Sequence, residues 1–282
     1  MRYLLRTSVL GLCLSPCVVR GQCKPPRGSH EARLLAFYSV PVVFTADPSM
    51  LATPSSPELR VAVEGAYVPT PSASVQHTEY CYTGKAEHTG LTSVFGRPRV
   101  ALTLPSGFGA EFSYLPSVTI SEATPNLVSG AVWFTRLIQN GTALTFRVHG
   151  TTGTIRGPIT CPKDALQQGD PNGVCYGNAP SMDEFKPQMA GEELIVQKSS
   201  AATPVSFVAG VGVNQLLPRF RVGFSDLNGG TDHTTISVNL TRYTAFLGGT
   251  FRFAKRCAAT AEGYASISDV ETVRGFASCR IF

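Results

Sequence analysis

The chain is poor in charged residues and lacks the long apolar run of a membrane-spanning helix. Charged residues make up 15% of its 282 residues, whereas soluble globular proteins carry about 25%. After the first 20 positions no run reaches the roughly 18 apolar residues that a helical span needs. The 24 Lys and Arg residues are scattered and form no basic run. The composition therefore argues against a helical membrane protein and against a nucleic-acid partner.

The chain also lacks the motifs that most often carry enzyme or metal chemistry. It contains no Gly-x-Ser-x-Gly motif, no Cys-x-x-Cys pair and only five histidines. Three groups are candidates: an Asp–His pair at a loop–strand junction, a histidine beside two charged strand residues, and His and Glu residues in the first long loop. Their members are Asp226, Asp232 and His233; Glu111, Arg147 and His149; and His77, Glu79, Glu87 and His88. Loop solvation and ion pairing explain all three, so we expect no catalytic residue, no metal site and no cofactor.

The first residues have the pattern of an export signal. A short basic start precedes an uncharged, mostly apolar stretch over residues 7–19, and short residues follow at the positions that a signal peptidase reads. We predict that residues 1–21 are a signal peptide and that the mature chain begins at Gln22. A short buried helix and a lipoprotein anchor are the alternatives.

Export changes what the cysteines imply. The mature part holds six, and an even number in an oxidising compartment makes disulfides the default. Cys161 and Cys175 bracket a loop rich in Pro, Gly and Asp, so loop closure favours them as partners. The remaining pairs are one that brackets a C-terminal segment and one left by elimination: Cys257 with Cys279, and Cys23 with Cys81.

From about residue 58 the chain alternates apolar and polar residues with the period of a β-strand. Leu144, Phe146 and Val148, for example, share one face of a segment whose other face is polar. The segments with a strand pattern are 59–68, 99–104, 109–115, 126–138, 143–150, 204–214, 219–226 and 234–253. Of these, segment 126–138 is apolar on both faces.

The connections between these segments alternate in length. Residues 105–107, 139–142 and 215–218 form short turns, and the second contains an Asn-Gly hairpin signal. Residues 69–96, 116–125, 151–203 and 227–233 form long loops. This pattern predicts an all-β fold, a closed antiparallel transmembrane β-barrel with short periplasmic turns and long external loops. The barrel must close, because an open edge in lipid leaves backbone groups unsatisfied. A secreted soluble β-sandwich is the alternative.

Charged residues stand in the middle of several predicted strands, on the face opposite the apolar one. In a small barrel they would face a narrow lumen and would have to pair. We therefore predict a lumenal charge cluster of Arg60, Glu64, Arg99, Glu111, Arg147, His149, Arg219 and Arg221.

The end of the last segment has alternating apolar residues and a final aromatic, at Tyr243, Leu247, Gly249, Phe251 and Phe253. In this feature the chain resembles small Gram-negative outer-membrane β-barrel proteins, and the resemblance implies that the barrel-assembly machinery recognises these residues. Residues 104–116 are further similar to barrel proteins of environmental bacteria, which implies no activity. The barrel either closes near Phe253 with eight strands and a tail, or continues to Phe282 with ten. We expect eight, because ten would place Cys257 and Cys279 near opposite rims.

The expected organisation is a signal peptide (1–21), an N-terminal periplasmic segment (22–58), an outer-membrane barrel (59–253) and a C-terminal tail or final strands (254–282). The expected function is non-enzymatic, with a structural, surface-interaction or small-solute role. Outer-membrane lipid, the barrel-assembly machinery and an unknown ligand at the external loops are the expected partners, and the long loop 151–203 is the main binding candidate. A barrel enzyme acting on lipid or peptide and a soluble binding module are the alternatives.

Overall fold

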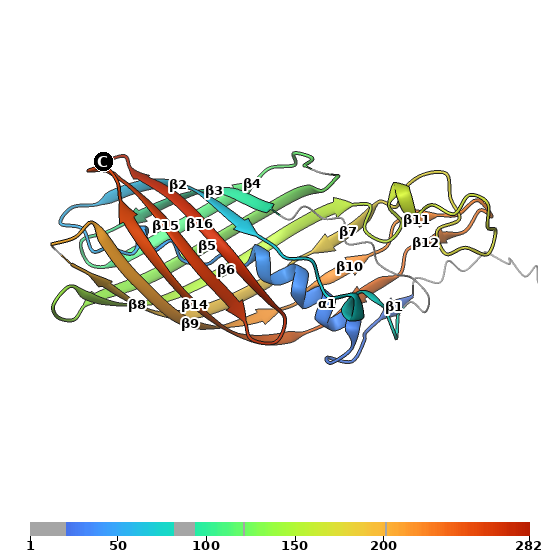
Figure 1. Ribbon diagram of the computed structural model, residues 1–282, viewed down its shortest axis with the longest axis horizontal. Helices are drawn as coiled ribbons and strands as arrows, with labels where there is room; N and C mark the ends of the chain where they lie inside the picture. Colours follow the sequence, from blue (N-terminus) through green and yellow to red (C-terminus); the bar gives the residue numbers. More distant parts are fainter. Residues whose placement is uncertain (1–20, 82–93, 121, 201) are drawn as a thin grey trace, which may run out of the picture.

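Ten antiparallel strands close into a barrel in the computed structural model, which describes residues 21–81, 94–120, 122–200 and 202–282 (Figure 1). Each strand pairs with its neighbours in chain order, and the last pairs back to the first over eight residue pairs. The barrel strands are β2 (Glu58–Tyr67), β3 (Val94–Thr103), β4 (Phe108–Leu115), β5 (Thr124–Leu137), β6 (Thr142–Gly157), β8 (Met189–Ser199), β9 (Val205–Leu216), β14 (Leu240–Arg252), β15 (Cys257–Ser266) and β16 (Val270–Arg280).

Short helices and strands lie outside this wall. The helices are α1 (His30–Ser39), α2 (Ala73–Gln76) and the 3-10 turns η1 (Val40–Val42), η2 (Pro48–Met50) and η3 (Lys163–Ala165). The strands are β1 (Gln22–Cys23), β7 (Asp183–Lys186), β10 (Arg219–Arg221), β11 (Phe224–Ser225), β12 (Thr231–Asp232) and β13 (Thr235–Ser237).

The two ends of the barrel differ in their connections. Residues 104–107, 138–141, 200–204 and 253–256 make short turns at one end, where the C-terminus also lies (Figure 1). Strands β2, β6 and β9 lead into long connections at the other end, where β4 is joined to β5 and where the tight turn 267–269 also lies. We call these the short-turn end and the long-loop end.

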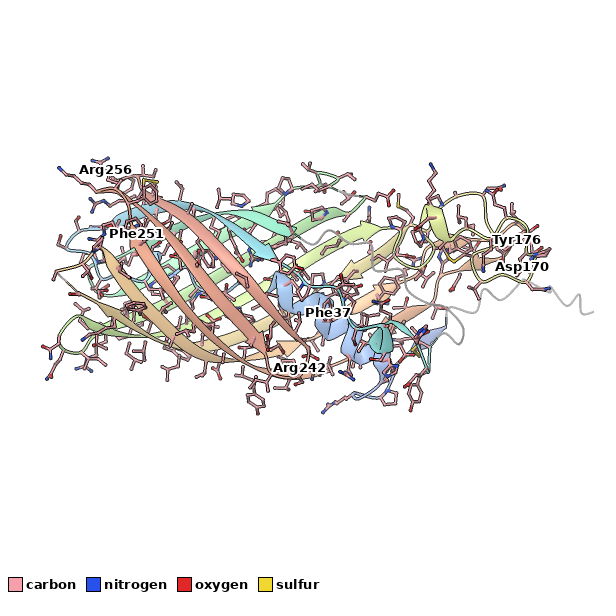
Figure 2. All side chains as sticks on the ribbon, viewed as in Figure 1. Phe37, Asp170, Tyr176, Arg242, Phe251 and Arg256 are labelled. Atoms are coloured by element: carbon pink, nitrogen blue, oxygen red, sulfur yellow. A yellow bond between two sulfur atoms is a disulfide. The ribbon has the colours of Figure 1, made fainter. Side chains whose placement is uncertain are left out.

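The outer face of the wall is apolar. Outward side chains such as Val63, Phe207 and Leu247 are 62%, 64% and 68% exposed. Phe251 lies on this surface near the short-turn end (Figure 2). Exposed apolar surface of this extent on a monomer marks contact with lipid or with another protein.

The prediction of eight strands is wrong, and the alternative of ten is the correct count. The chain turns back at residues 267–269, so that β15 and β16 form a hairpin after Phe253. In this hairpin Cys257 and Cys279 are direct cross-strand partners at the short-turn end and form a disulfide. Ten strands therefore place these two cysteines at the same end, contrary to the expectation that they would lie near opposite rims. Residues 254–282 are therefore the final strands and not a tail.

Two predicted segments also have other roles than expected. The expected long loop 151–203 contains β7 and the barrel strand β8. Segment 219–226, expected in the barrel wall, forms β10 and β11 outside it. In β8 the residues Gly191, Glu192 and Glu193 interrupt the apolar alternation, which is why the sequence pattern did not indicate a strand there.

Residues 30–51, which precede β2, fill the barrel, and we call them the plug. The Ser29 side chain caps α1 by accepting the N–H of Ala32, and Pro41, within the following 3-10 turn, stands just beyond its end. Residues 40–51 continue through the lumen toward the short-turn end, and Phe44 is fully buried there. The expectation of a periplasmic segment over 22–58 is thereby corrected. Residues 34–51 carry a single charge, Asp47, and such an apolar stretch requires a core to cover it.

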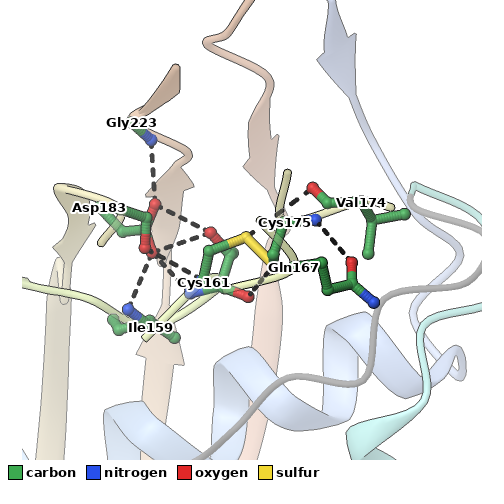
Figure 3. The surroundings of a disulfide bond; sticks show 9 residues. Ile159, Cys161, Gln167, Val174, Cys175, Asp183 and Gly223 are labelled. Atoms are coloured by element: carbon green, nitrogen blue, oxygen red, sulfur yellow. Dashed lines mark hydrogen bonds between the residues drawn. A yellow bond between two sulfur atoms is a disulfide. The ribbon is translucent and has the colours of Figure 1, made fainter. Parts of the chain in front are cut away.

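A small sheet extends the wall at the long-loop end. The last residues of β6 pair with β7, and β10, β13 and β1 follow in order. Cys161 and Cys175 form the predicted disulfide, and Cys23 is bonded to Cys81, the pair left by elimination. Both disulfides lie at this end. Beside the Cys161–Cys175 disulfide, the buried carboxylate of Asp183 accepts N–H groups from Ile159, Thr160 and Gly223 and anchors the clipped loop to the sheet (Figure 3).

Candidate functional site

A layer of ion pairs crosses the middle of the lumen. The Glu64 carboxylate accepts hydrogen bonds from Arg97 Nε at 2.6 Å, Arg99 Nη1 at 3.0 Å and Arg274 Nη1 at 3.1 Å. All four side chains are buried, so each charge depends on its partners for the solvation that water would otherwise give.

A second part of the layer continues around the wall. Arg99 Nε donates to Glu111 at 2.7 Å, and Arg147 Nη2 reaches the same carboxylate at 3.3 Å. Arg147 Nη1 also donates to Glu193 at 2.7 Å. We call the connected set the lumenal ion network: Glu64, Arg97, Arg99, Glu111, Arg147, Glu193 and Arg274.

The guanidinium groups of the network also hold the plug. Hydrogen bonds run from Arg274 Nη2 to the Val40 carbonyl at 3.0 Å, from Arg97 Nη2 to that of Val43 at 2.6 Å and from Arg147 Nη1 to that of Phe44 at 2.6 Å. The plug backbone is irregular there, and its carbonyls need donors from the wall. Arginine suits this position because its five N–H donors serve a carboxylate and a carbonyl at once.

The Phe44 ring packs beneath these cations. The guanidinium carbons of Arg99, Arg97 and Arg147 lie 4.3, 4.9 and 5.2 Å from the ring centroid. The ring thus fills the centre of the layer and adds cation–π attraction to the carbonyl contacts.

The structure brings together five of the eight residues predicted for the lumenal cluster: Glu64, Arg99, Glu111, Arg147 and His149, whose Nε2 lies 3.7 Å from Glu193. Arg60 also faces inward but pairs with Glu58 near the short-turn end. Arg219 and Arg221 are exposed on β10, outside the lumen, which corrects their assignment. Sequence reasoning missed four buried lumenal residues: Arg97, Glu193, Glu262 and Arg274.

An apolar pocket lies beyond the network, toward the long-loop end. It has a volume of about 150 Å³, and α1 contributes Leu34, Phe37 and Tyr38 to its lining. The wall and the small sheet contribute further apolar side chains, among them Phe95, Leu115, Ile155, Phe185, Phe220 and Ile236. Glu31 is the one charged residue among the lining residues that the structure describes.

Glu31 is buried at the edge of this pocket and is held through one of its two carboxylate oxygens. Its Oε1 accepts the backbone N–H groups of Glu79, Tyr80 and Cys81 at 2.7, 2.5 and 3.0 Å. Burial alone would raise the pKa of this carboxyl, but the three N–H donors outweigh it and hold the pKa below its ordinary value. With the Cys23–Cys81 disulfide, this contact ties the outer end of the plug to the loop after β2.

None of the described groups weighed for catalysis or metal binding lines the pocket. His233 Nδ1 is 3.5 Å from the Val222 carbonyl, and Asp232 accepts the N–H of Thr234. His77 and Glu79 lie beside His30, whereas Glu87 and His88 fall outside the described residues, as does the predicted signal peptide. Among the residues that the structure covers, no three His, Cys, Asp or Glu side chains are grouped as a metal site.

No protein-family model matches the chain, and no curated protein does. Among solved structures the chain is similar to outer-membrane β-barrel proteins. The Pseudomonas putida toluene transporter TodX gives a TM-score of 0.34 at 10% identity, over 79% of this chain and 67% of that one. The translocator domain of the Neisseria meningitidis autotransporter NalP gives 0.35 at 10%, over 89% and 94%. The attachment invasion locus protein Ail of Yersinia pestis gives 0.23 at 8%, over 79% and 95%.

The fold and the lumen define a closed ten-stranded β-barrel whose own N-terminal segment fills it. The expectation of a closed antiparallel β-barrel is confirmed, and the solved structures to which the chain is similar are outer-membrane β-barrel proteins. In the described part of the chain, no helix has both the length and the apolar character to cross a membrane.

Proposed function

We propose that this protein is a non-enzymatic barrel of the outer membrane that binds a small apolar molecule at its long-loop end. The pocket between α1 and the strand ends carries this proposal. Among the described residues its lining is almost wholly apolar, and one oxygen of the Glu31 carboxylate accepts three backbone N–H groups. An apolar cavity of roughly 150 Å³ can hold benzene, so the ligand class is a compact hydrocarbon-like molecule of about that size.

The apolar outer surface supports the membrane location. Side chains such as Val63 and Leu247 would be costly in water but match a hydrocarbon environment. A closed barrel satisfies its wall hydrogen bonds without water, as lipid requires. By the usual orientation of outer-membrane barrels, the short-turn end faces the periplasm and the pocket faces outward. Outer-membrane lipid and the barrel-assembly machinery are the partners that this location implies.

The plug supports binding over open diffusion. Residues 40–51 occupy the lumen between the pocket and the short-turn end, and the lumenal ion network holds them there. The pocket is therefore blind toward the short-turn end, and a permanently open pore is not the proposed role. The groups weighed for catalysis lie elsewhere, which supports a non-enzymatic function.

The test uses fluorobenzene as the probe, observed by fluorine NMR with the full mature chain in lipid nanodiscs. We expect saturable binding beyond that of empty nanodiscs. Ala123 is buried and lines the pocket, so Ala123→Phe should fill the site and weaken binding about tenfold or more, since each 1.4 kcal/mol changes affinity tenfold. The matched control is Ala190→Phe on the outward face of β8. Equal binding by both variants, or no saturable binding by the wild type, would refute the proposal.

A further inference from the structure

Apart from Thr70 in the loop after β2, the exposed lining residues of the apolar pocket lie in one place in the barrel wall. Among its lining residues, Val94 and Gly96 are exposed at the start of β3. Leu115, half-buried, and Ile120, exposed, stand at the end of β4 and in the loop after it. The pocket therefore reaches the surface between β3 and β4, in the side of the barrel.

The hydrogen-bonded ladder is incomplete at this boundary. β3 pairs with β2 along its whole length, from Glu58↔Thr103 to Tyr67↔Val94, and β4 pairs with β5 up to Leu115↔Leu127. Between β3 and β4 the described pairs number four and end at Val100↔Phe112. From this pair toward the long-loop end, β3 and β4 are not paired, and we call this gap in the ladder the split. The wall on either side of it, formed by β2–β3 and β4–β5, is fully paired.

Pro98 explains where the ladder stops. The N–H of Leu104 donates to Phe108, so every second residue of β3 directs its N–H and carbonyl toward β4. By this register Pro98 stands opposite Tyr114 and would have to donate next, but proline has no N–H. A side-chain contact replaces the ladder, because the Ser113 hydroxyl donates to the Pro98 carbonyl at 2.6 Å.

We propose that the split between β3 and β4 is a lateral portal through which a small apolar ligand passes between the pocket and the lipid. The chemistry of the rim fits this route. Val94, Gly96, Leu115 and Ile120 offer apolar surface to a ligand, whereas a water-facing mouth would be rimmed by polar groups. Tyr67 and Tyr114 point outward on the two sides of the split, and tyrosine is typical of the membrane interface.

The blind inner end of the pocket strengthens this inference. A ligand cannot continue toward the short-turn end while residues 40–51 fill the lumen. An apolar molecule is also far more concentrated in lipid than in water. A lateral opening therefore exposes the pocket to the phase in which the ligand is more concentrated. The inference rests on the proposed function, since it assigns an access route to the same pocket.

The test measures exchange of fluorobenzene between the bound and the lipid-dissolved state by two-dimensional fluorine exchange NMR in nanodiscs. Pro98→Val restores the missing N–H and should extend the ladder, slowing exchange about tenfold, as expected for an added hydrogen bond that opening must break. Ile120→Arg, in the exposed loop at the rim, is a second variant that does not depend on the strand pairing. It should also slow exchange, and Pro98→Val, at a residue outside the pocket lining, should leave the dissociation constant within about twofold of the wild-type value.

The matched control is Thr70→Arg, which places a charge at an exposed lining residue of the loop after β2. If the portal is the route, this variant exchanges at the wild-type rate. Slowing by Thr70→Arg together with wild-type rates in Pro98→Val and Ile120→Arg would overturn the portal and assign entry to the water-facing loops. Failure of the proposed function would look different, because the wild type would then show no bound signal at all.

Discussion

Replacing Glu64 by Ala tests the assignment of the two strand faces most directly. Glu64 is completely buried and accepts hydrogen bonds from three guanidinium groups. Removing one partner of a buried ion pair costs about 3–5 kcal/mol. We expect at least that loss in the free energy of unfolding, because three cations lose a common partner.

The neighbouring residue supplies the matched control. Val63 precedes Glu64 on β2, points outward and is 62% exposed. In Val63→Ala the surrounding lipid replaces the lost methyl contacts, so the expected cost is roughly 0.5 kcal/mol or less. Glu64→Gln keeps the side-chain volume and removes only the charge, so its cost should lie between those of the two alanine variants.

The assay is urea unfolding in vesicles of fixed composition, followed by tryptophan fluorescence. Trp133 is the only tryptophan of the chain and is buried in the lumen, so its emission reports opening of the barrel. The dependence of the unfolding free energy on urea should be equal in all variants, since a change would indicate another unfolded state. If Val63→Ala is the more damaging substitution, the apolar face is a packed core, and both the barrel assignment and its inward charges fail.

Three further perturbations address the plug. The native pKa of the Glu31 carboxyl is held below its ordinary 4.5 by backbone N–H groups despite burial, so its stabilisation is complete above about pH 4.5 and is lost as the pH falls through the native pKa. The protection factors of the amides of residues 79–81, which correct for the slower intrinsic hydrogen exchange in acid, should therefore fall over that range, and Glu31→Gln should show low protection at every pH. Replacing Cys23 and Cys81 by Ser frees the outer end of the plug, so hydrogen exchange in α1 and ion conductance in planar bilayers should both rise. Variants with serine pairs at the other two disulfides serve as controls. Equal conductance in all three variants would show that the lumenal ion network alone retains the plug. Phe44→Ala removes the ring beneath three guanidiniums and should lower the unfolding free energy by about 3–5 kcal/mol in the same urea titration; an unchanged midpoint would refute a structural role for the ring.

The barrel could be predicted from the sequence because a two-residue period is a direct consequence of strand geometry. In β2, β4 and β6 the outward residues are those that the apolar alternation indicates. The number of barrel strands was predicted wrongly because the apolar alternation is weak in some of them. Small residues occupy much of β15, and Glu192 and Glu193 place charges on both faces of β8. A barrel wall tolerates an outward-facing charged residue near a rim. Such a residue interrupts the apolar alternation, however, so the sequence pattern does not indicate the strand.

The charge cluster was predictable only in part, because half of its partners are not side chains. Arg97 has the same strand parity as Arg99 and could have been included, whereas Glu193 and Arg274 lie on strands that the pattern did not reveal. The carbonyls of Val40, Val43 and Phe44 carry no signal in the sequence. The carbonyls of an irregular segment cannot be predicted from the sequence as hydrogen-bond acceptors, because only the fold shows that the segment lies in the lumen.

The plug gives a single physical reason for both the ion network and the pocket. Eight strands leave an interior that side chains can fill, and ten leave a wider one. The irregular backbone that fills it exposes carbonyls, so arginines must face them, and carboxylates must then balance the buried arginines. The charges therefore belong to the closure of the lumen and need no transported ion to explain them. The pocket is the space left where α1 stands away from the wall, and the split at Pro98 connects that space to the outside. It follows that a change in the ion network should alter conductance but leave fluorobenzene exchange unchanged, provided that α1 stays in place.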